Sequence, residues 1–136
     1  MKEIDFSTNN LQLTTNNMKK FRFLDWQVYR DAQRLFSLVL SVTKKLPHEF
    51  RFELTSQPIR SSFSIVLNIA EGSGKISDKE LNRFIDIALG SAYETVAGMD
   101  TLRINGFITD VEFTGVKELT SSICDQLGGF KKVMDK

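Results

Sequence analysis

The 136-residue chain is 41% hydrophobic and 26% charged, which is the composition of an ordinary globular domain rather than of a disordered or membrane-spanning protein. Its formal net charge of +1 excludes a protein that binds polyanions over its whole surface. Cys124 is the single cysteine, and neither a signal peptide nor a membrane-spanning run is visible, so we expect a cytoplasmic protein without an intrachain disulfide.

The N-terminal segment contains the pairs NN, TT and NN and has neither a helical nor a strand period. Such a polar segment buries too little apolar surface to be held in place, so residues 1–20 are predicted to be a mobile N-terminal tail. Residues 21–136 are predicted to form one four-helix-bundle domain.

The first predicted helix covers residues 24–45. Its apolar residues recur at alternating spacings of four and three, which places them on one face of a helix: Val28, Ala32, Leu35, Val39, Val42 and Leu46. Lys44 and Lys45 suit the negative C-terminal end of this helix, and Pro47 ends it.

The second predicted helix covers residues 50–71 and is followed by Gly72 and Gly74, which suit a C-terminal cap. The third begins at Ser77, whose hydroxyl forms a capping box with Glu80 three residues later. The third helix closes near residues 105–106, and its core positions are Leu81, Ile85, Ala88, Ala92 and Met99.

The fourth predicted helix starts near Asp110, and its apolar face contains Val116, Leu119, Ile123, Leu127, Phe130 and Val133. The connections between the four helices are short, which favours antiparallel neighbours. The predicted fold class is therefore all-α, an up-down-up-down four-helix bundle.

The second helix has a thin polar face on an otherwise apolar helix, the reverse of an ordinary surface helix. We call this face the polar seam, and its members fall within an arc of about 80°: Gln57, Arg60, Ser64, Asn68 and Glu71. Three bundle partners do not cover so apolar a helix, so burial against another subunit is predicted, with the seam either lining a narrow solvated channel or forming a buried hydrogen-bond network.

Arg60 and Glu71 lie about 16 Å apart along the helix axis, too far to pair. We therefore expect the counter-charge of Arg60 to be Glu94 or an acid of a neighbouring subunit. Glu94 belongs to a second face of the third helix that also contains Gly90 and Ser91, and close helix approach, within the bundle or between subunits, would explain a glycine there.

The charge is uneven along the chain, because residues 19–60 have a net charge of +5 and residues 61–136 a net charge of −3. A basic first half indicates either a phosphate-binding surface or solvated helix faces. The candidate nucleic-acid contacts are the lysines and arginines between positions 19 and 45: Lys19, Lys20, Arg22, Arg30, Arg34, Lys44 and Lys45.

The stretches LPHEFRFELTSQPIRSSFSIVLNIAEGSGK and FIDIALGSAYE resemble the 23S rRNA intervening-sequence protein family, also called four-helix-bundle proteins. The family pattern is LP-x-E, then L-x-x-Q-x-x-R, S-I-x-x-N-I-A-E-G-x-G-R and A-x-G-S-x-x-E. The matching residues are Leu46, Pro47, Glu49, Leu54, Gln57, Arg60, Ser64, Ile65, Asn68, Ile69, Ala70, Glu71, Gly72, Gly74, Ala88, Gly90, Ser91 and Glu94.

The resemblance covers roughly residues 23–108, with two departures. Lys75 stands where the family usually has arginine, which keeps the charge but loses the bidentate geometry. Pro58 stands where an aliphatic residue is usual, and because it lacks an amide hydrogen we expect the second helix to kink or restart near Gln57.

The resemblance implies a bundle that assembles as a homopentamer and members encoded within insertions of bacterial 23S rRNA genes. A similar pentameric bundle, the accessory variability determinant of diversity-generating retroelements, binds nucleic acid and a reverse transcriptase. The partners implied for this chain are thus further copies of itself, RNA or DNA bound weakly, and a reverse transcriptase or another nucleic-acid enzyme; no membrane partner is expected.

The predicted function is a non-catalytic oligomeric interaction protein. The alternative is an enzyme of unknown reaction that uses the polar seam, with Glu71 as general base, but no second acid is placed beside Glu71 by spacing. The motif GSGK follows a helix, whereas a phosphate-binding loop precedes one. With one histidine, His48, and one cysteine, the chain lacks the ligands of a di-iron or zinc site, so no cofactor or metal is expected.

Overall fold

A computed structural model describes residues 2–5, 12–15 and 19–134 of the chain. Its elements follow one another as β1 (Lys2–Asp5), β2 (Gln12–Thr15), the short 3-10 helix η1 (Arg22–Asp25), α1 (Gln27–Thr43), α2 (His48–Ser73), α3 (Asp78–Ile104) and α4 (Asp110–Met134).

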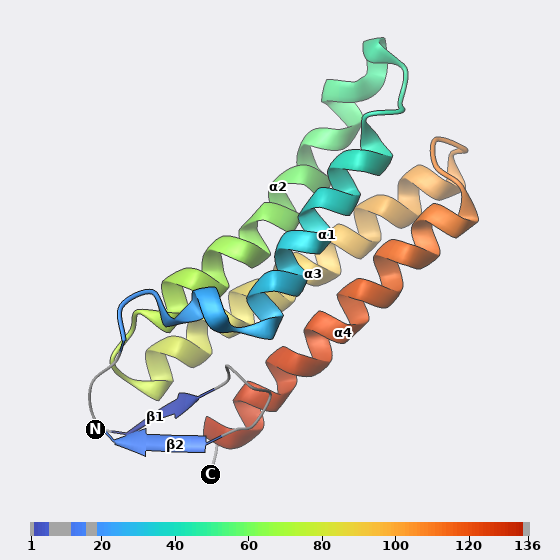
Figure 1. The fold of residues 1–136 in the computed structure, drawn as a ribbon. Helices are drawn as coiled ribbons and strands as arrows, with labels where there is room; N and C mark the ends of the chain where they lie inside the picture. Colours follow the sequence, from blue (N-terminus) through green and yellow to red (C-terminus); the bar gives the residue numbers. More distant parts are fainter. Residues whose placement is uncertain (1, 6–11, 16–18, 135–136) are drawn as a thin grey trace.

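The four long helices form one antiparallel bundle. Each helix runs back along its predecessor, and α4 returns to lie beside α1, which closes the bundle (Figure 1). The contact between α2 and α3 is the most extensive of the four. The predicted all-α, up-down-up-down bundle is therefore confirmed for a single chain, whereas the pentameric assembly stays a prediction.

The N-terminal segment differs from the expectation that it lacks regular structure. β1 and β2 form a two-stranded antiparallel sheet in which Lys2 lies opposite Thr15 and Asp5 opposite Gln12. Strand pairing uses backbone groups, so a polar hairpin leaves no apolar alternation for the sequence to reveal. The predicted mobility of residues 1–20 stays a prediction, and residues 1, 6–11 and 16–18 lie outside the described residues.

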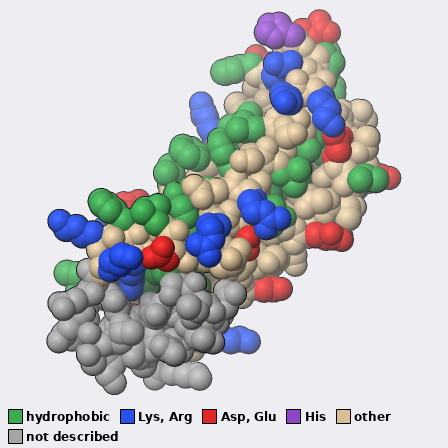
Figure 2. All heavy atoms as spheres, in the orientation of Figure 1, with side chains coloured by type: hydrophobic (Ala, Val, Ile, Leu, Met, Phe, Trp, Pro, Cys, Tyr) green, Lys and Arg blue, Asp and Glu red, His purple; other side chains and the backbone are tan. Residues whose placement is uncertain are grey.

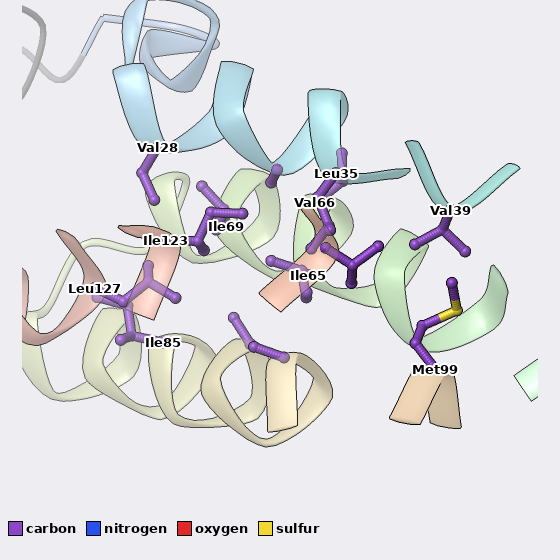
Figure 3. Close-up of a cluster of buried hydrophobic side chains, with 14 of the residues drawn as sticks. Val28, Leu35, Val39, Ile65, Val66, Ile69, Ile85, Met99, Ile123 and Leu127 are labelled. Atoms are coloured by element: carbon purple, nitrogen blue, oxygen red, sulfur yellow. The ribbon is translucent and has the colours of Figure 1, made fainter. Parts of the chain in front are cut away.

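The core lies where the helical periods place it. All the predicted core positions of α1 and α3 are buried, and on α4 only Leu119 and Val133 are half-buried rather than buried. Figure 3 shows side chains from all four helices pointing toward one another: Val28, Leu35, Val39, Ile65, Val66, Ile69, Ile85, Met99, Ile123 and Leu127. Burial of each such side chain contributes about 1.5–3 kcal/mol, which makes this core the main source of stability.

Side-chain caps fix the starts of α3 and α4. The hydroxyl of Ser77 accepts a hydrogen bond from the Glu80 amide at 3.1 Å, which is one of the two bonds of the predicted capping box. At α4 the Glu112 amide donates to the Thr109 hydroxyl at 3.1 Å and the Thr109 amide donates to the Glu112 carboxylate at 2.9 Å. A hydrogen bond from Lys45, and then that from Thr109, lowers the pKa of Glu112 below its usual value.

Pro58 does not interrupt α2, which is continuous from His48 to Ser73, so the predicted restart near Gln57 is wrong. The proline is buried where α3 has Gly98, and a Cβ at Gly98 would lie 3.0 Å from the Pro58 ring. The hydroxyl of Ser62 donates to the Pro58 carbonyl at 2.8 Å. The proline ring thus fills a notch that the glycine leaves, and this packing offsets the lost backbone hydrogen bond.

This notch predicts different effects for two chemically identical substitutions. Gly128 lies within α4 with nothing within 4 Å of an added Cβ, so Gly128→Ala should raise the free energy of unfolding by up to about 1 kcal/mol through helix propensity. Gly98→Ala should be less stable than Gly128→Ala by about 1–3 kcal/mol, because its methyl group overpacks against Pro58. Urea unfolding measures both, and equal stabilities for the two variants would contradict the notch.

Candidate functional site

The polar seam faces outward from the bundle in the single chain. Gln57, Arg60 and Glu71 are exposed, while Ser64 and Asn68 are half-buried. From Gln57 to Glu71 the seam extends about 21 Å along α2 at the usual rise per residue. The five side chains therefore form a line and do not converge on one point.

The half-buried part of the seam joins α2 to α3. Asn68 Nδ2 donates to the Ser64 carbonyl at 2.8 Å and to its hydroxyl at 3.0 Å, and the Ser64 and Ser91 hydroxyls lie 2.9 Å apart. One turn away, the buried hydroxyls of Ser61 and Thr95 lie 2.7 Å apart. These paired hydroxyls allow α2 and α3 to approach closely without leaving a buried polar group unsatisfied.

Arg60 is exposed in the single chain and does not pair with Glu94. Within residues 19–134, neither side chain forms an ion pair or hydrogen bond, and the same holds for the side chain of Glu71. A counter-charge for Arg60 from a neighbouring subunit stays a prediction.

The two glycines of the predicted site have different surroundings. Gly72 is buried, and a Cβ there would lie 2.9 Å from the Phe84 Cβ, so only glycine fits between α2 and α3. Gly90 is exposed, with nothing within 4 Å of an added Cβ. Close approach within the bundle is therefore not the reason for Gly90, which leaves the predicted contact between subunits.

Large apolar side chains remain exposed on the outward side of α2. Phe52 is 75% exposed, Phe63 44% and Leu67 49%, and Leu40 on the adjacent α1 is 39% exposed. Phe63 lies against Phe36 of α1, with ring centroids 5.1 Å apart. In Figure 2 green side chains follow this side of the molecule. Several large apolar side chains exposed on one side of a helix favour an interaction surface there.

At least three of the seven candidate nucleic-acid contacts pair with carboxylates. Lys19 lies 3.2 Å from Asp25, Arg34 lies 3.0 Å from Asp31, and Lys45 pairs with Glu112. These three are consequently less available to a phosphate than the sequence suggests.

The remaining four basic residues are Lys20, Arg22, Arg30 and Lys44. Arg22 donates to the Ser73 carbonyl at 2.9 Å, and its guanidinium lies 5.2 Å from the centre of the Trp26 ring. Arg30 donates to the Gln27 side chain at 3.3 Å, and Lys20 and Lys44 are exposed.

The sequence analysis did not identify Asp31, which lies beside the candidate nucleic-acid contact Arg34. It is the only acid between residues 27 and 43, and it is buried, accepting hydrogen bonds from Gln27, Arg34 and Gln126. The outward face of α1 therefore has no exposed carboxylate. The spacing of Gln27 and Arg34 around Asp31 was the available signal, but the contact with Gln126 on α4 depends on the fold.

No metal centre or membrane span is found in the part of the chain that the structure describes. It contains no cluster of three or more His, Cys, Asp or Glu side chains suited to holding a metal ion. No helix among those residues is both long and apolar enough to cross a bilayer.

These features define a class of protein, a closed antiparallel four-helix bundle with an outward polar and apolar face on α2. The family model of the 23S rRNA-intervening sequence protein matches residues 24–129. The chain therefore belongs to the 23S rRNA-intervening sequence protein family, as the resemblance of its NIAEG-x-G motif indicates.

A solved structure has the same fold. The crystal structure of a protein with unknown function from the S23 ribosomal protein family of Bacteroides thetaiotaomicron is similar with a TM-score of 0.69 at 24% identity. The similarity covers 74% of this chain and 94% of that one. No protein of curated function matches this chain. The neighbour thus supports the fold and carries no activity over.

Proposed function

We propose that this protein is a non-catalytic interaction protein that works as a homo-oligomer assembled through the outward side of α2. The observation that carries this proposal is the exposure of Phe52, Phe63 and Leu67 on α2, the helix that makes the most extensive contact with α3. Removing such side chains from water contributes about 25 cal/mol per Å² of apolar area, so an exposed row of them favours association. The family resemblance favours five copies.

The proposed second contact is with nucleic acid along α1. The outward face of this helix has basic side chains and no exposed carboxylate, which is the electrostatic arrangement that attracts a phosphate backbone. Several basic residues are already paired, so each copy neutralises few phosphates and binding is weak and salt-sensitive. In this proposal the oligomer is an accessory subunit that presents RNA or DNA to a nucleic-acid enzyme such as a reverse transcriptase.

An enzyme using the polar seam is the weaker candidate. A general base must lie within hydrogen-bond reach of its substrate together with the groups that stabilise the developing charge. Gln57, Arg60 and Glu71 instead line up along about 21 Å of one helix, which suits a contact surface better than a reaction centre.

The assembly is tested by light scattering of the purified chain. We expect a mass of about five times the 15.5 kDa chain mass. Phe52→Asp should reduce this mass by placing a charge in the interface, while leaving the fold intact because Phe52 is 75% exposed. The matched control is Val111→Asp, at a position 82% exposed on α4, which should leave the mass unchanged. A wild-type mass of 15.5 kDa would contradict the proposal.

Nucleic-acid binding is tested by fluorescence anisotropy with single-stranded RNA and duplex DNA. We expect micromolar binding that weakens as salt is raised from about 50 to 200 mM, with a shallow slope because few phosphates are contacted. Arg30→Glu combined with Lys44→Glu should weaken binding at least tenfold, whereas Lys132→Glu on α4 should not. Sequence-selective nanomolar binding at about 150 mM salt, or equal losses in both variants, would show that another surface is used.

A further inference from the structure

A groove of about 720 Å³ runs between α3 and α4 on the outside of the bundle. Its lining from α3 extends from Ala92 to Arg103 and its lining from α4 from Phe113 to Asp125, about 17 Å along each helix. Several of the side chains that line the groove are small or of medium size: Ala92, Val96, Ala97, Thr120 and Cys124. Small side chains on both helices leave a channel as long as three turns of a helix, which is the shape that receives another helix.

Two opposite charges lie along the α4 side of this groove. Lys117 and Asp125 are exposed, and within residues 19–134 neither forms an ion pair or a side-chain hydrogen bond. They are eight residues apart, about 12 Å along the axis. On the α3 side the charges are already satisfied, since Arg103 pairs with Asp100 at 2.6 Å. A helix that lies in the groove and runs parallel to α4 therefore passes the unpaired Lys117 first and the unpaired Asp125 second.

The outward side of α2 has the complementary order of charges. Glu53 and Arg60 are exposed and seven residues apart, about 10 Å along the same face of the helix. Within residues 19–134 neither has an ion-pair partner. Phe52 and Phe63 lie on one flank of this face, about 16 Å apart, with the small Ser56 between them. We call these five residues the α2 ridge.

We propose that the α2 ridge of one copy docks into the α3–α4 groove of the next copy, with Glu53 against Lys117 and Arg60 against Asp125. This inference rests on the proposed homo-oligomer and names both surfaces of its interface. Phe52 and Phe63 then reach the two ends of the groove, and Ser56 faces the small side chains at its middle. The spacings of the two charge pairs agree within about 2 Å, which is less than the reach of the side chains.

The docked α2 runs parallel to α4 of the next copy. A rotation about an axis along the bundle keeps α2 of one copy parallel to α4 of the next, and in that direction Glu53 and Arg60 meet Lys117 and Asp125 in matching order. Phe63 of the ridge packs against Phe36 of α1, whereas the groove lies between α3 and α4, so the two surfaces are on different sides of the bundle. The contact is therefore head-to-tail, and each copy has one surface for the copy before it and another for the copy after it.

The charge distribution of the molecule supports contact between unlike surfaces. Figure 2 shows blue side chains along the α1 face and red side chains along the edge formed by α4. If the α1 face of one copy paired with the α1 face of another, basic residues would lie against each other. Docking of α2 onto α3 and α4 instead joins the basic half of one chain to the acidic half of the next.

Cross-linking tests the proposal, because Cys124 in the groove is the only cysteine of the chain. Ser56→Cys places a second thiol on the α2 ridge, and a short bis-maleimide should join it to Cys124 of the next copy. The contact is head-to-tail, so we expect a ladder of products larger than dimers on a denaturing gel. Burial, and then the charge of Asp125, raise the pKa of the Cys124 thiol, so the reaction is run at alkaline pH.

The matched control is Ser41→Cys, an exposed serine on α1 that should give no ladder. A ladder from Ser41→Cys and none from Ser56→Cys would overturn the docking. If the wild-type protein is an oligomer by light scattering but Ser56→Cys gives no ladder, the docking is wrong and the proposed function stands. A monomeric wild-type protein would contradict both the docking and the proposed function.

A charge exchange provides a second test that does not depend on thiol chemistry. Arg60→Asp and Asp125→Arg should each raise the dissociation constant of the oligomer at least tenfold, and the double variant should recover most of the loss. Both positions are exposed, so the single variants keep their folds, which circular dichroism checks. Additive losses in the double variant would show that the two side chains do not meet.

Discussion

The close contact between α2 and α3 is the constraint on which the rest of this structure depends. Gly98 receives the Pro58 ring, and Gly72 allows Phe84 to approach to a distance that no other residue permits. Between these two points the hydroxyls of Ser61 and Thr95 satisfy each other. This side of α2 is fixed by shape and by hydrogen bonds together, and the opposite side of the helix is consequently turned to solvent.

The outward side of α2 and the groove between α3 and α4 both follow from that contact. A closed four-helix bundle covers each helix on two sides only, so a helix with apolar residues around most of its circumference keeps some of them exposed. Phe52, Phe63 and Leu67 are among the residues that stay exposed. The small residues Ala92 and Thr120 leave space on the far side of α3. A head-to-tail assembly requires two complementary surfaces on each copy, and the projecting side chains of α2 and the α3–α4 groove are such a pair.

Much of the bundle could be predicted from the sequence because its signals are local. Each signal involves residues that are close in the sequence: the apolar period of α1, the N-cap of Ser77 and the turn at Gly106, which has a φ of +79°. The restart expected near Gln57 does not occur, because the proline ring is accommodated by Gly98, forty residues away. A residue that breaks an isolated helix is tolerated where a distant partner leaves room for it.

The residues of the polar seam could be predicted from the sequence, but their contacts and exposure could not. Spacing identified Arg60 and Asn68 as one face of a helix, but only the fold separates them, since Asn68 bonds to Ser64 at the contact with α3 whereas Arg60 points to solvent. The groove was missed because it depends on the register between α3 and α4. Small residues at Ala92 and Thr120 carry no signal until the two helices are placed side by side.

Hydroxyl-radical footprinting of the assembled and dissociated protein tests the central claim that the α2 ridge is covered by the α3–α4 groove. Phe52 on the ridge and Tyr93 on the groove are 75% and 74% exposed in the single chain, and Phe21, 67% exposed, belongs to neither surface. The account predicts that assembly protects Phe52 and Tyr93 together from oxidation and leaves Phe21 unchanged. Undiminished oxidation of Phe52 and Tyr93 in the assembled protein would contradict it.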